Sequence, residues 1–196
     1  MGIPVLILGE SGSGKSTSLR NFSPDEIGVF NVASKPLPFR KRIPCANGAT
    51  YRMIESSLKH PKLHTYVVDD SQSLMAFELF SKAKETGYGK FTDIAVNFYK
   101  LLRTVAEDTP PDCIVYFLHH VETTDSGHIK AKTVGKMLDN QLTVEGLFSI
   151  VLLCKTDGKR HWFETQSDGF TTAKSPMEMF PPEIDNDLKA VDTAIR

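Results

Sequence analysis

Several features are scarce in this 196-residue sequence, and each scarcity excludes a class of protein. It has only three cysteines, Cys45, Cys113 and Cys154, an odd and scattered set that does not fit a disulfide framework. Two of them lie in or beside apolar, strand-like runs, so we expect buried reduced thiols and a cytoplasmic protein. No apolar run approaches the roughly 20 residues that span a bilayer. Met1 leads directly into an apolar run, so we expect neither a signal peptide nor a membrane partner.

A charge excess is also missing. The formal net charge is −1, so the chain as a whole does not attract nucleic acid, and any such role requires a local basic patch. Hydrophobic residues make up 40% of the chain and charged residues 24%, as in ordinary globular proteins. The length fits one domain over residues 1–196.

What is present is a complete phosphate-binding pattern near the start of the sequence. The pattern GxxxxGKS is formed by Gly9, Glu10, Ser11, Gly12, Ser13, Gly14, Lys15 and Ser16, with Thr17 directly behind it. An apolar run over residues 3–8 suits a buried strand before it, and residues 16–22 suit a helix after it.

The spacing of this P-loop follows from the chemistry of holding a triphosphate. The glycines let successive backbone N–H groups point into one concavity, and the N-terminus of the following helix adds partial positive charge. Lys15 is placed to reach the β- and γ-phosphates, and the Ser16 hydroxyl to ligate Mg²⁺. For Glu10 two positions are open, one facing solvent and one near the attacking water. The motif predicts a nucleoside-triphosphate binder.

A second motif, of the Walker B type, follows from a short apolar run that ends in two acids. Residues 66–68 precede Asp69 and Asp70, and a carboxylate at the end of such a strand holds Mg²⁺ beside the P-loop. We assign this role to Asp69. For Asp70 two roles are open, the N-cap of a helix over residues 71–85 or the activation of water.

A third strand, over residues 113–122, carries His119 and His120 near its end. A polar side chain at this position is suited to sensing the γ-phosphate or the attacking water. Adjacent side chains point to opposite faces of a strand and no third ligand stands at metal spacing, so we do not expect a zinc site.

Three polar stretches leave alternatives open. Residues 35–62 hold seven Lys or Arg against the single acid Glu55, which suits a solvated loop or a phosphate-contacting surface. Residues 86–91, TGYGKF, lie near three lysines and suit base stacking or an ordinary turn between helices. Residues 123–140, with Lys130, Lys132 and Lys136, are predicted to form a long mobile loop.

The remaining patterns complete an α/β fold. We expect a strand over residues 26–33, helices over 71–85 and 92–107, and a short helix at the end of the sequence. Asp157-Gly158 between the runs 148–155 and 160–166 predicts a β-hairpin.

Together these elements resemble the RecA-like branch of P-loop ATPases. Beside the P-loop and VVDDSQSL, the segments FNVASKPLPFR, YFLHHVE, KTVGKMLD and AKSPMEMFPPEIDNDL are similar to short, core-only AAA/RecA-like ATP-binding proteins of bacteriophage replication and recombination modules. The resemblance implies a three-layer P-loop NTPase with a RecA-like, mostly parallel sheet, ATP and Mg²⁺ as ligands, and a homo-oligomer. It also implies DNA recombination or single-strand annealing on single-stranded DNA, with a single-strand-binding or recombination protein as a partner, in the host cytoplasm if the protein is phage-encoded.

Residue by residue, the resemblance places Lys15, Ser16 and Asp69 at the phosphate and Mg²⁺ positions and His119 or His120 at the polar sensor. Lys174 resembles the lysine that reaches a neighbouring subunit's nucleotide. RadA-type relatives have an arginine close after that lysine, whereas this sequence has Ser175 and Pro176. Lys159 or Arg160 in the predicted hairpin is an alternative source of this second cation.

A second departure concerns the water-activating glutamate, because Ala33-Ser34-Lys35 stands where RecA-like enzymes carry it. Our hypothesis is that Asp70 takes this role.

Three functions therefore stay open. The first is a DNA-stimulated ATPase. The second is a switch that binds ATP with little hydrolysis, which the missing glutamate favours. The third is a small nucleotide kinase, although no arginine for a substrate-covering lid lies between Arg103 and Arg160.

Overall fold

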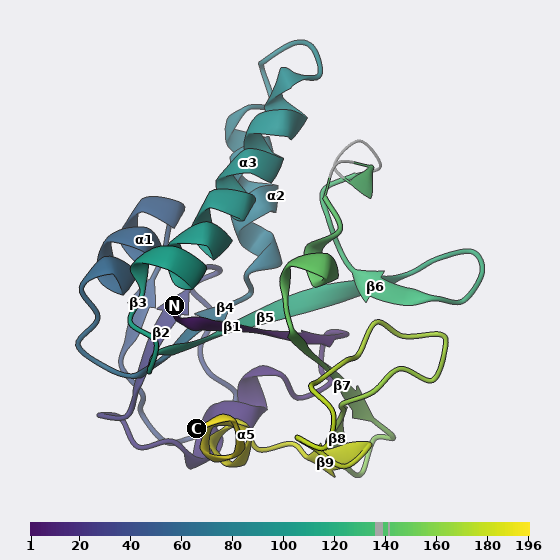
Figure 1. The fold of residues 1–196 in the computed structure, drawn as a ribbon. Coiled ribbons are helices and arrows are strands. Elements are labelled where there is room, and N and C mark those ends of the chain that lie inside the picture. Colours follow the sequence, from purple (N-terminus) through teal and green to yellow (C-terminus); the bar gives the residue numbers. More distant parts are fainter. Residues whose placement is uncertain (136–138, 141) are drawn as a thin grey trace.

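The computed structural model describes residues 1–135, 139–140 and 142–196, and shows one mixed sheet with helices on both faces (Figure 1). The strands of this part are β1 (Ile3–Gly9), β2 (Ile27–Asn31), β3 (Cys45–Asn47), β4 (Thr65–Asp69), β5 (Ile114–Thr123), β6 (Ile129–Ala131), β7 (Ile150–Thr156), β8 (His161–Glu164) and β9 (Glu183–Asp185). The helices are α1 (Tyr51–Lys59), α2 (Gln72–Ser81), α3 (Gly89–Arg103) and α5 (Leu188–Ile195), with short 3₁₀ turns η1 (Ser16–Asn21) and η3 (Val144–Leu147) and a π-helical turn η2 (Thr104–Asp108).

The strand order is β3-β2-β4-β5-β1-β7-β8-β9, with β6 paired to β5 outside this path. All neighbours from β3 to β7 run parallel, and β7, β8 and β9 are antiparallel. The prediction of an α/β fold with a mostly parallel sheet is confirmed, and so is the hairpin. In its turn the Asp157 carboxylate accepts hydrogen bonds from the backbone N–H groups of Lys159 and Arg160, and Gly158 supplies a positive φ of 88°.

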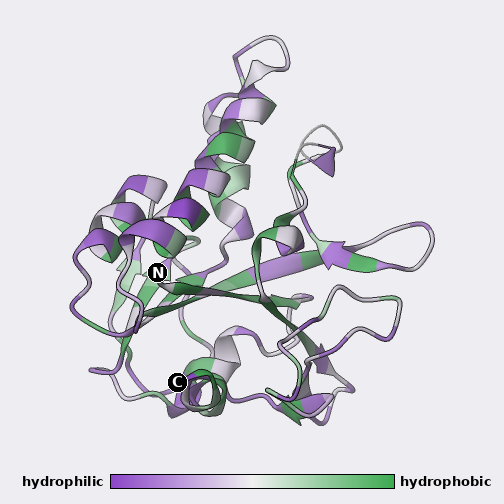
Figure 2. Ribbon diagram, in the orientation of Figure 1, coloured by the Kyte–Doolittle hydropathy of each residue, from purple (hydrophilic) through white to green (hydrophobic). Residues whose placement is uncertain are grey.

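The central strands are apolar along their whole length because both faces of the sheet are covered. In β1, Leu6 and Leu8 face the core under α1, α2 and α3, whereas Val5 and Ile7 face the core that contains residues of η1 and α5. This alternation has the period of two expected of a strand. Figure 2 shows the apolar colouring concentrated on the sheet and on the inner sides of the helices that cover it.

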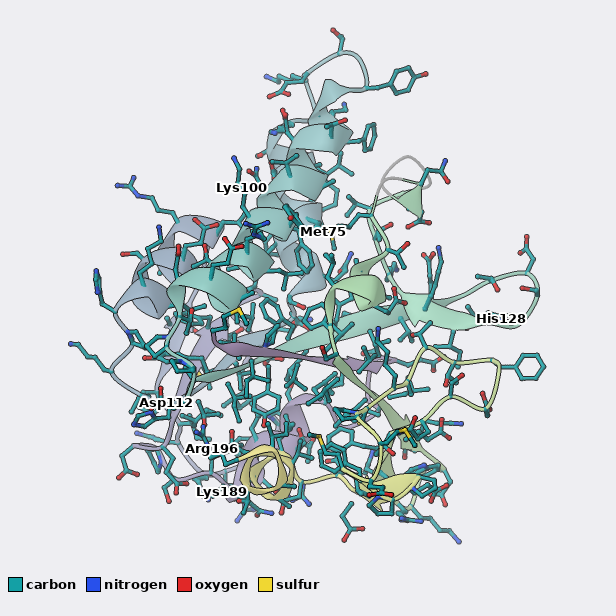
Figure 3. The ribbon with its side chains drawn as sticks, viewed as in Figure 1. Met75, Lys100, Asp112, His128, Lys189 and Arg196 are labelled. Atoms are coloured by element: carbon teal, nitrogen blue, oxygen red, sulfur yellow. The ribbon has the colours of Figure 1, made fainter. Side chains whose placement is uncertain are left out.

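Helix α2 and helix α3 form an antiparallel pair that projects from the sheet (Figure 1). We call residues 72–103 the α2–α3 arm. Its far end exposes two aromatic side chains, Phe80 at 71% and Tyr88 at 72%. Figure 3 shows Lys100 on the outer side of α3 and His128 on the distant β5–β6 hairpin.

Several predicted elements differ from those observed. The helix expected after the P-loop is the six-residue 3₁₀ turn η1, which is too short to add a substantial helix dipole. Helix α2 ends at Ser81, four residues before the predicted end, and α3 begins at Gly89, within the predicted 86–91 turn.

The prediction of a long mobile loop over residues 123–140 is wrong for the part that the structure describes. Strand β6 pairs antiparallel with the end of β5, and Lys130 forms ion pairs of 2.9 Å with both Glu122 and Asp139. Lys136, which belongs to the same stretch, lies outside the described residues. The basic segment 35–62 is also more ordered than a solvated loop, because it contains β3 and α1.

None of the helices described here has both the length and the apolar character needed to cross a bilayer. The three cysteines are free thiols, with Cys113 and Cys154 buried as expected and Cys45 partly buried. Burial raises the pKa of both buried thiols to about 11, which keeps them protonated and unreactive at neutral pH.

Candidate functional site

The carboxyl ends of four parallel strands bring the predicted motifs to one edge of the sheet. Strand β5 lies between β1 and β4, and in its register His120 stands opposite Gly9, the first residue of the P-loop. On the other side, Asp69 at the end of β4 stands opposite Asn31 at the end of β2. Side chains that are far apart in the sequence therefore face a common space.

The P-loop glycines are required by its geometry. Gly12 and Gly14 have φ values of 81° and 105°, which other residues rarely adopt. A Cβ atom on Gly9 would clash with the Ser13 hydroxyl and would lie 2.9 Å from the Cys154 carbonyl oxygen, so the loop closes tightly over its own first residue.

Three side chains to which the sequence patterns gave no role at the P-loop hold this loop, one each from β7, from β8 and from the segment after β9. His161 Nδ1 donates a hydrogen bond of 2.7 Å to the Ser13 carbonyl, and the Cys154 thiol donates one of 3.0 Å to the same oxygen. Asn186 Nδ2 donates to the Gly14 carbonyl at 3.2 Å. These contacts satisfy the outward-facing carbonyl groups, so that the opposite side of the loop is left for a ligand.

Lys15 is buried, with 6% of its surface exposed, and its ammonium group folds back onto the loop. Its Nζ donates to the carbonyl oxygens of Gly9 and Glu10, each at 2.8 Å. Burial lowers the pKa of Lys15, because desolvation disfavours the charged form, and the nearby Asp69 and Asp70 oppose this effect. A buried cation held by carbonyl dipoles is suited to an anionic ligand.

Ser16 and Asp69 meet directly, although 53 positions separate them in the sequence. The Ser16 hydroxyl donates to Asp69 Oδ1 at 2.9 Å, and Asp69 is only 6% exposed. Burial raises the pKa of Asp69, while the hydrogen bond from Ser16 opposes the rise. The carboxylate is thus desolvated and lacks a full positive partner within the described contacts.

Asp70 turns away from the strand in a left-handed conformation, with φ of 57°. One carboxylate oxygen lies 3.2 Å from His120 Nε2 and the other lies 2.9 Å from Lys35 Nζ. The hydrogen bond from His120, together with that from Lys35, lowers the pKa of Asp70 to about 2. The N-cap role considered for Asp70 is wrong, since Ser71 occupies that position and makes no side-chain cap hydrogen bond.

The two histidines of β5 have different surroundings. His120 lines the space beside the P-loop, whereas His119 is fully buried on the opposite face. His119 Nε2 donates to the Lys132 carbonyl at 2.9 Å, which leaves Nδ1 to accept a hydrogen bond of 2.9 Å from the Ser71 hydroxyl. His119 therefore connects β5 to the start of α2, and of the two residues only His120 has the position of a sensor.

The burial of His119 leads to a pH-dependent stability. Burial lowers the pKa of His119 from 6.5 to about 4, so between these values the unfolded chain binds a proton that the folded protein does not. The free energy of unfolding should therefore fall as the pH falls through this window, by at most about 3 kcal/mol from this residue. Urea unfolding of wild type and His119→Gln at pH 6.5, 5.5 and 4.5 measures the effect.

The variant should lose less stability across this range than the wild type, and the exposed His60→Gln serves as the matched control. Equal losses in wild type and His119→Gln would contradict the assignment.

A cavity of about 230 Å³ lies between the P-loop and the strand ends. It is lined by Ser11, Gly12, Gly14, Lys15, Ser16, Thr17, Lys35, Pro36, Pro38, Asp69, Asp70 and His120. A larger cavity of about 600 Å³ adjoins it and shares Lys35 and Pro36 with it. The smaller cavity has room for a phosphate chain, while a nucleoside would extend beyond it.

Other predicted site residues lie outside this cavity. Glu10 is exposed, and only its carbonyl oxygen contacts Lys15. Lys174 forms an antiparallel bridge with Val151, before the end of β7, and is not among the residues that line the cavity. Arg160 stacks over Trp162 at 5.4 Å beside the exposed hairpin turn that contains Lys159.

The donor set distinguishes between metals. Across residues 1–135, 139–140 and 142–196, no three His, Cys, Asp or Glu side chains gather in a way that would hold a metal ion. One hydroxyl and one carboxylate, as in Ser16 and Asp69, instead suit Mg²⁺, which keeps several waters and takes its remaining ligands from substrate phosphates.

No protein-family model matches this chain, and no curated protein sequence matches it either.

Proposed function

We propose that the protein is a RecA-like P-loop ATPase that binds ATP with Mg²⁺. The observation that carries the proposal is the 2.9 Å hydrogen bond between Ser16 and Asp69, which joins the two halves of a phosphate-binding and metal-binding site. Lys15 and the glycine turns of the P-loop lie in the same cavity. A strand between those of the two motifs, as β5 is, also presents a polar residue, His120, to that cavity.

Different residues of the site would hold the phosphates and the Mg²⁺ ion of the nucleotide. On ATP binding, the Lys15 ammonium group would move from the carbonyl oxygens of Gly9 and Glu10 to the β- and γ-phosphates. The backbone N–H groups of the loop would surround these phosphates. Ser16 and Asp69 would hold Mg²⁺, which when bound neutralises charge on the phosphate oxygens. The buried carboxylate of Asp69 fits this role, because a cation would offset the desolvation that now raises its pKa.

Asp70 remains our proposed water-orienting group, but its contacts also support the alternative of a slow switch. A carboxylate with a pKa of about 2, held by Lys35 and His120, is a weak base. Such a group orients water only after it is released from a partner. Low basal turnover that rises with a second ligand is therefore the behaviour we expect.

We further propose that the second ligand is single-stranded DNA, bound by an oligomer in recombination or annealing, and that the α2–α3 arm contacts it. Phe80 and Tyr88 are exposed near its end, and Lys84 and Lys90 lie between and beside them. Lys82 forms ion pairs with Glu78 and Asp93, so its charge is less available to DNA than those of Lys84 and Lys90. Exposed aromatic rings interleaved with lysines stack on bases and neutralise the backbone.

The test compares ATP hydrolysis with and without single-stranded DNA in the wild type and in a Phe80→Ser/Tyr88→Ser variant. We expect DNA to stimulate wild-type turnover, and the variant to bind DNA about ten-fold more weakly, from the loss of stacking. Phe170→Ser, which removes an exposed ring distant in sequence from the arm, is the control. DNA binding should weaken steeply with salt. ATP binding without DNA stimulation would leave the ATPase proposal standing and contradict the role of DNA.

A further inference from the structure

The turn that follows β2 is built to present one lysine to the P-loop cavity. Asn31, which is 3% exposed, holds this turn through both ends of its amide group. Its Nδ2 donates to the Lys35 carbonyl at 2.6 Å, and its Oδ1 accepts from the Lys35 N–H at 3.2 Å. Ser34 takes a left-handed conformation, with φ of 56°, to complete the turn. A left-handed serine is retained only where surrounding contacts enforce it. Here the hydrogen bonds from Asn31 fix the backbone position of Lys35.

The Lys35 side chain, in contrast, is free to change partners. It is 67% exposed, and its contact with Asp70, at 2.9 Å, is its one ion pair in the described part of the chain. The ammonium end of this ion pair is solvated, and a solvated ion pair contributes little to stability. The ammonium group can therefore move within the cavity at small cost while its backbone stays fixed.

Charge balance indicates where Lys35 would move. Lys15, Lys35, Asp69 and Asp70 all line the cavity, so their two positive and two negative charges cancel. A bound triphosphate with one Mg²⁺ adds net negative charge beside Lys35, most of all at its terminal phosphate. Lys15 alone cannot balance this charge and that of the two carboxylates, so a second cation is drawn to the phosphate.

We propose that Lys35 recognises the terminal phosphate of the nucleotide and leaves Asp70 when that phosphate is bound. This inference rests on the proposed function of ATP binding. One ion pair replaces another and no covalent bond changes. The exchange releases Asp70 from its cation on one side, while His120 still holds the other oxygen, and Asp70 can then accept a hydrogen bond from water. A nucleoside diphosphate lacks the terminal group and leaves Lys35 on Asp70.

Calorimetric titration of Mg²⁺ complexes of ADP and of a non-hydrolysable ATP analogue tests this proposal on wild type and Lys35→Met. We expect the variant to bind the analogue about ten-fold more weakly and ADP within two-fold of wild type, which corresponds to about 1.4 kcal/mol on the terminal phosphate alone. Lys35→Arg should restore most of the analogue affinity. Lys59→Met, which removes an exposed lysine paired with Asp108, is the matched control and should change neither affinity.

A second variant gives an effect of the opposite sign. Asp70→Asn removes the partner that Lys35 must leave, so affinity for the analogue should rise about three-fold while ATP turnover falls, because the amide is no base. Equal effects of Lys35→Met on both nucleotides, or none on either, would overturn the role of Lys35. A wild type that binds neither nucleotide would instead overturn the proposed function, so the two failures are distinguishable.

Discussion

Replacement of Lys15 by alanine is expected to weaken ATP binding about a thousand-fold, equivalent to about 4 kcal/mol. Lys15 is the buried cation of the P-loop, and the methyl group of alanine neither reaches the phosphates nor carries charge. Calorimetric titration with Mg²⁺ and the non-hydrolysable ATP analogue measures the loss.

The matched control for this experiment is Lys59→Ala, an exposed lysine of α1, which should bind as the wild type does. Circular dichroism and thermal unfolding verify that Lys15→Ala is folded. A folded Lys15→Ala protein with wild-type affinity would rule out the P-loop as the nucleotide site.

The second large effect is expected from Asp69→Asn, which keeps the shape of the side chain and removes its charge. Without that charge the site should hold Mg²⁺ poorly, and we expect ATP turnover at millimolar Mg²⁺ to fall about a thousand-fold. Binding of ATP in the absence of Mg²⁺ should change little or improve, since a negative group near the phosphates is lost. Turnover measured across a Mg²⁺ titration gives the result.

The Asp69→Asn variant also provides its own control, because its thermal stability should rise while its ATP turnover falls. Burial raises the pKa of Asp69, which means that the charged form is costly in the ligand-free fold. Removal of the charge is therefore expected to raise the melting temperature of the ligand-free protein slightly. Unchanged turnover in a folded Asp69→Asn protein would contradict the assignment of Asp69 to the metal.

The parts of this site that the sequence predicts are those with a local pattern. The P-loop and the acidic end of β4 each combine a buried strand with a fixed chemical group, so the two motifs are sufficient to place Lys15, Ser16 and Asp69 together. The central strands were predictable for the same reason, as continuous apolar runs are typical of strands buried on both faces. The prediction of a long loop over residues 123–140 was wrong because β6 is only three residues long and contains no apolar run that would indicate a strand.

Tertiary contacts explain what could not be predicted. Nothing in the local sequence marks His161 or Asn186 as supports of the P-loop, since their partners lie 148 and 172 positions away. The two histidines of β5 could not be separated either, because their roles depend on which face of the strand points to the P-loop. Lys35 stands out only once the turn held by Asn31 places it opposite Asp70.

The supports of the P-loop also determine when this site can form. The motif is synthesised well before Cys154, His161 and Asn186, which hold its carbonyl groups and follow them by 141, 148 and 172 positions. Contacts of such large sequence separation carry a high loop-closure cost, and they cannot form before the distant partner has been synthesised. A growing chain should thus carry the P-loop sequence long before it can hold a nucleotide, and bound ATP should preferentially stabilise fully folded molecules.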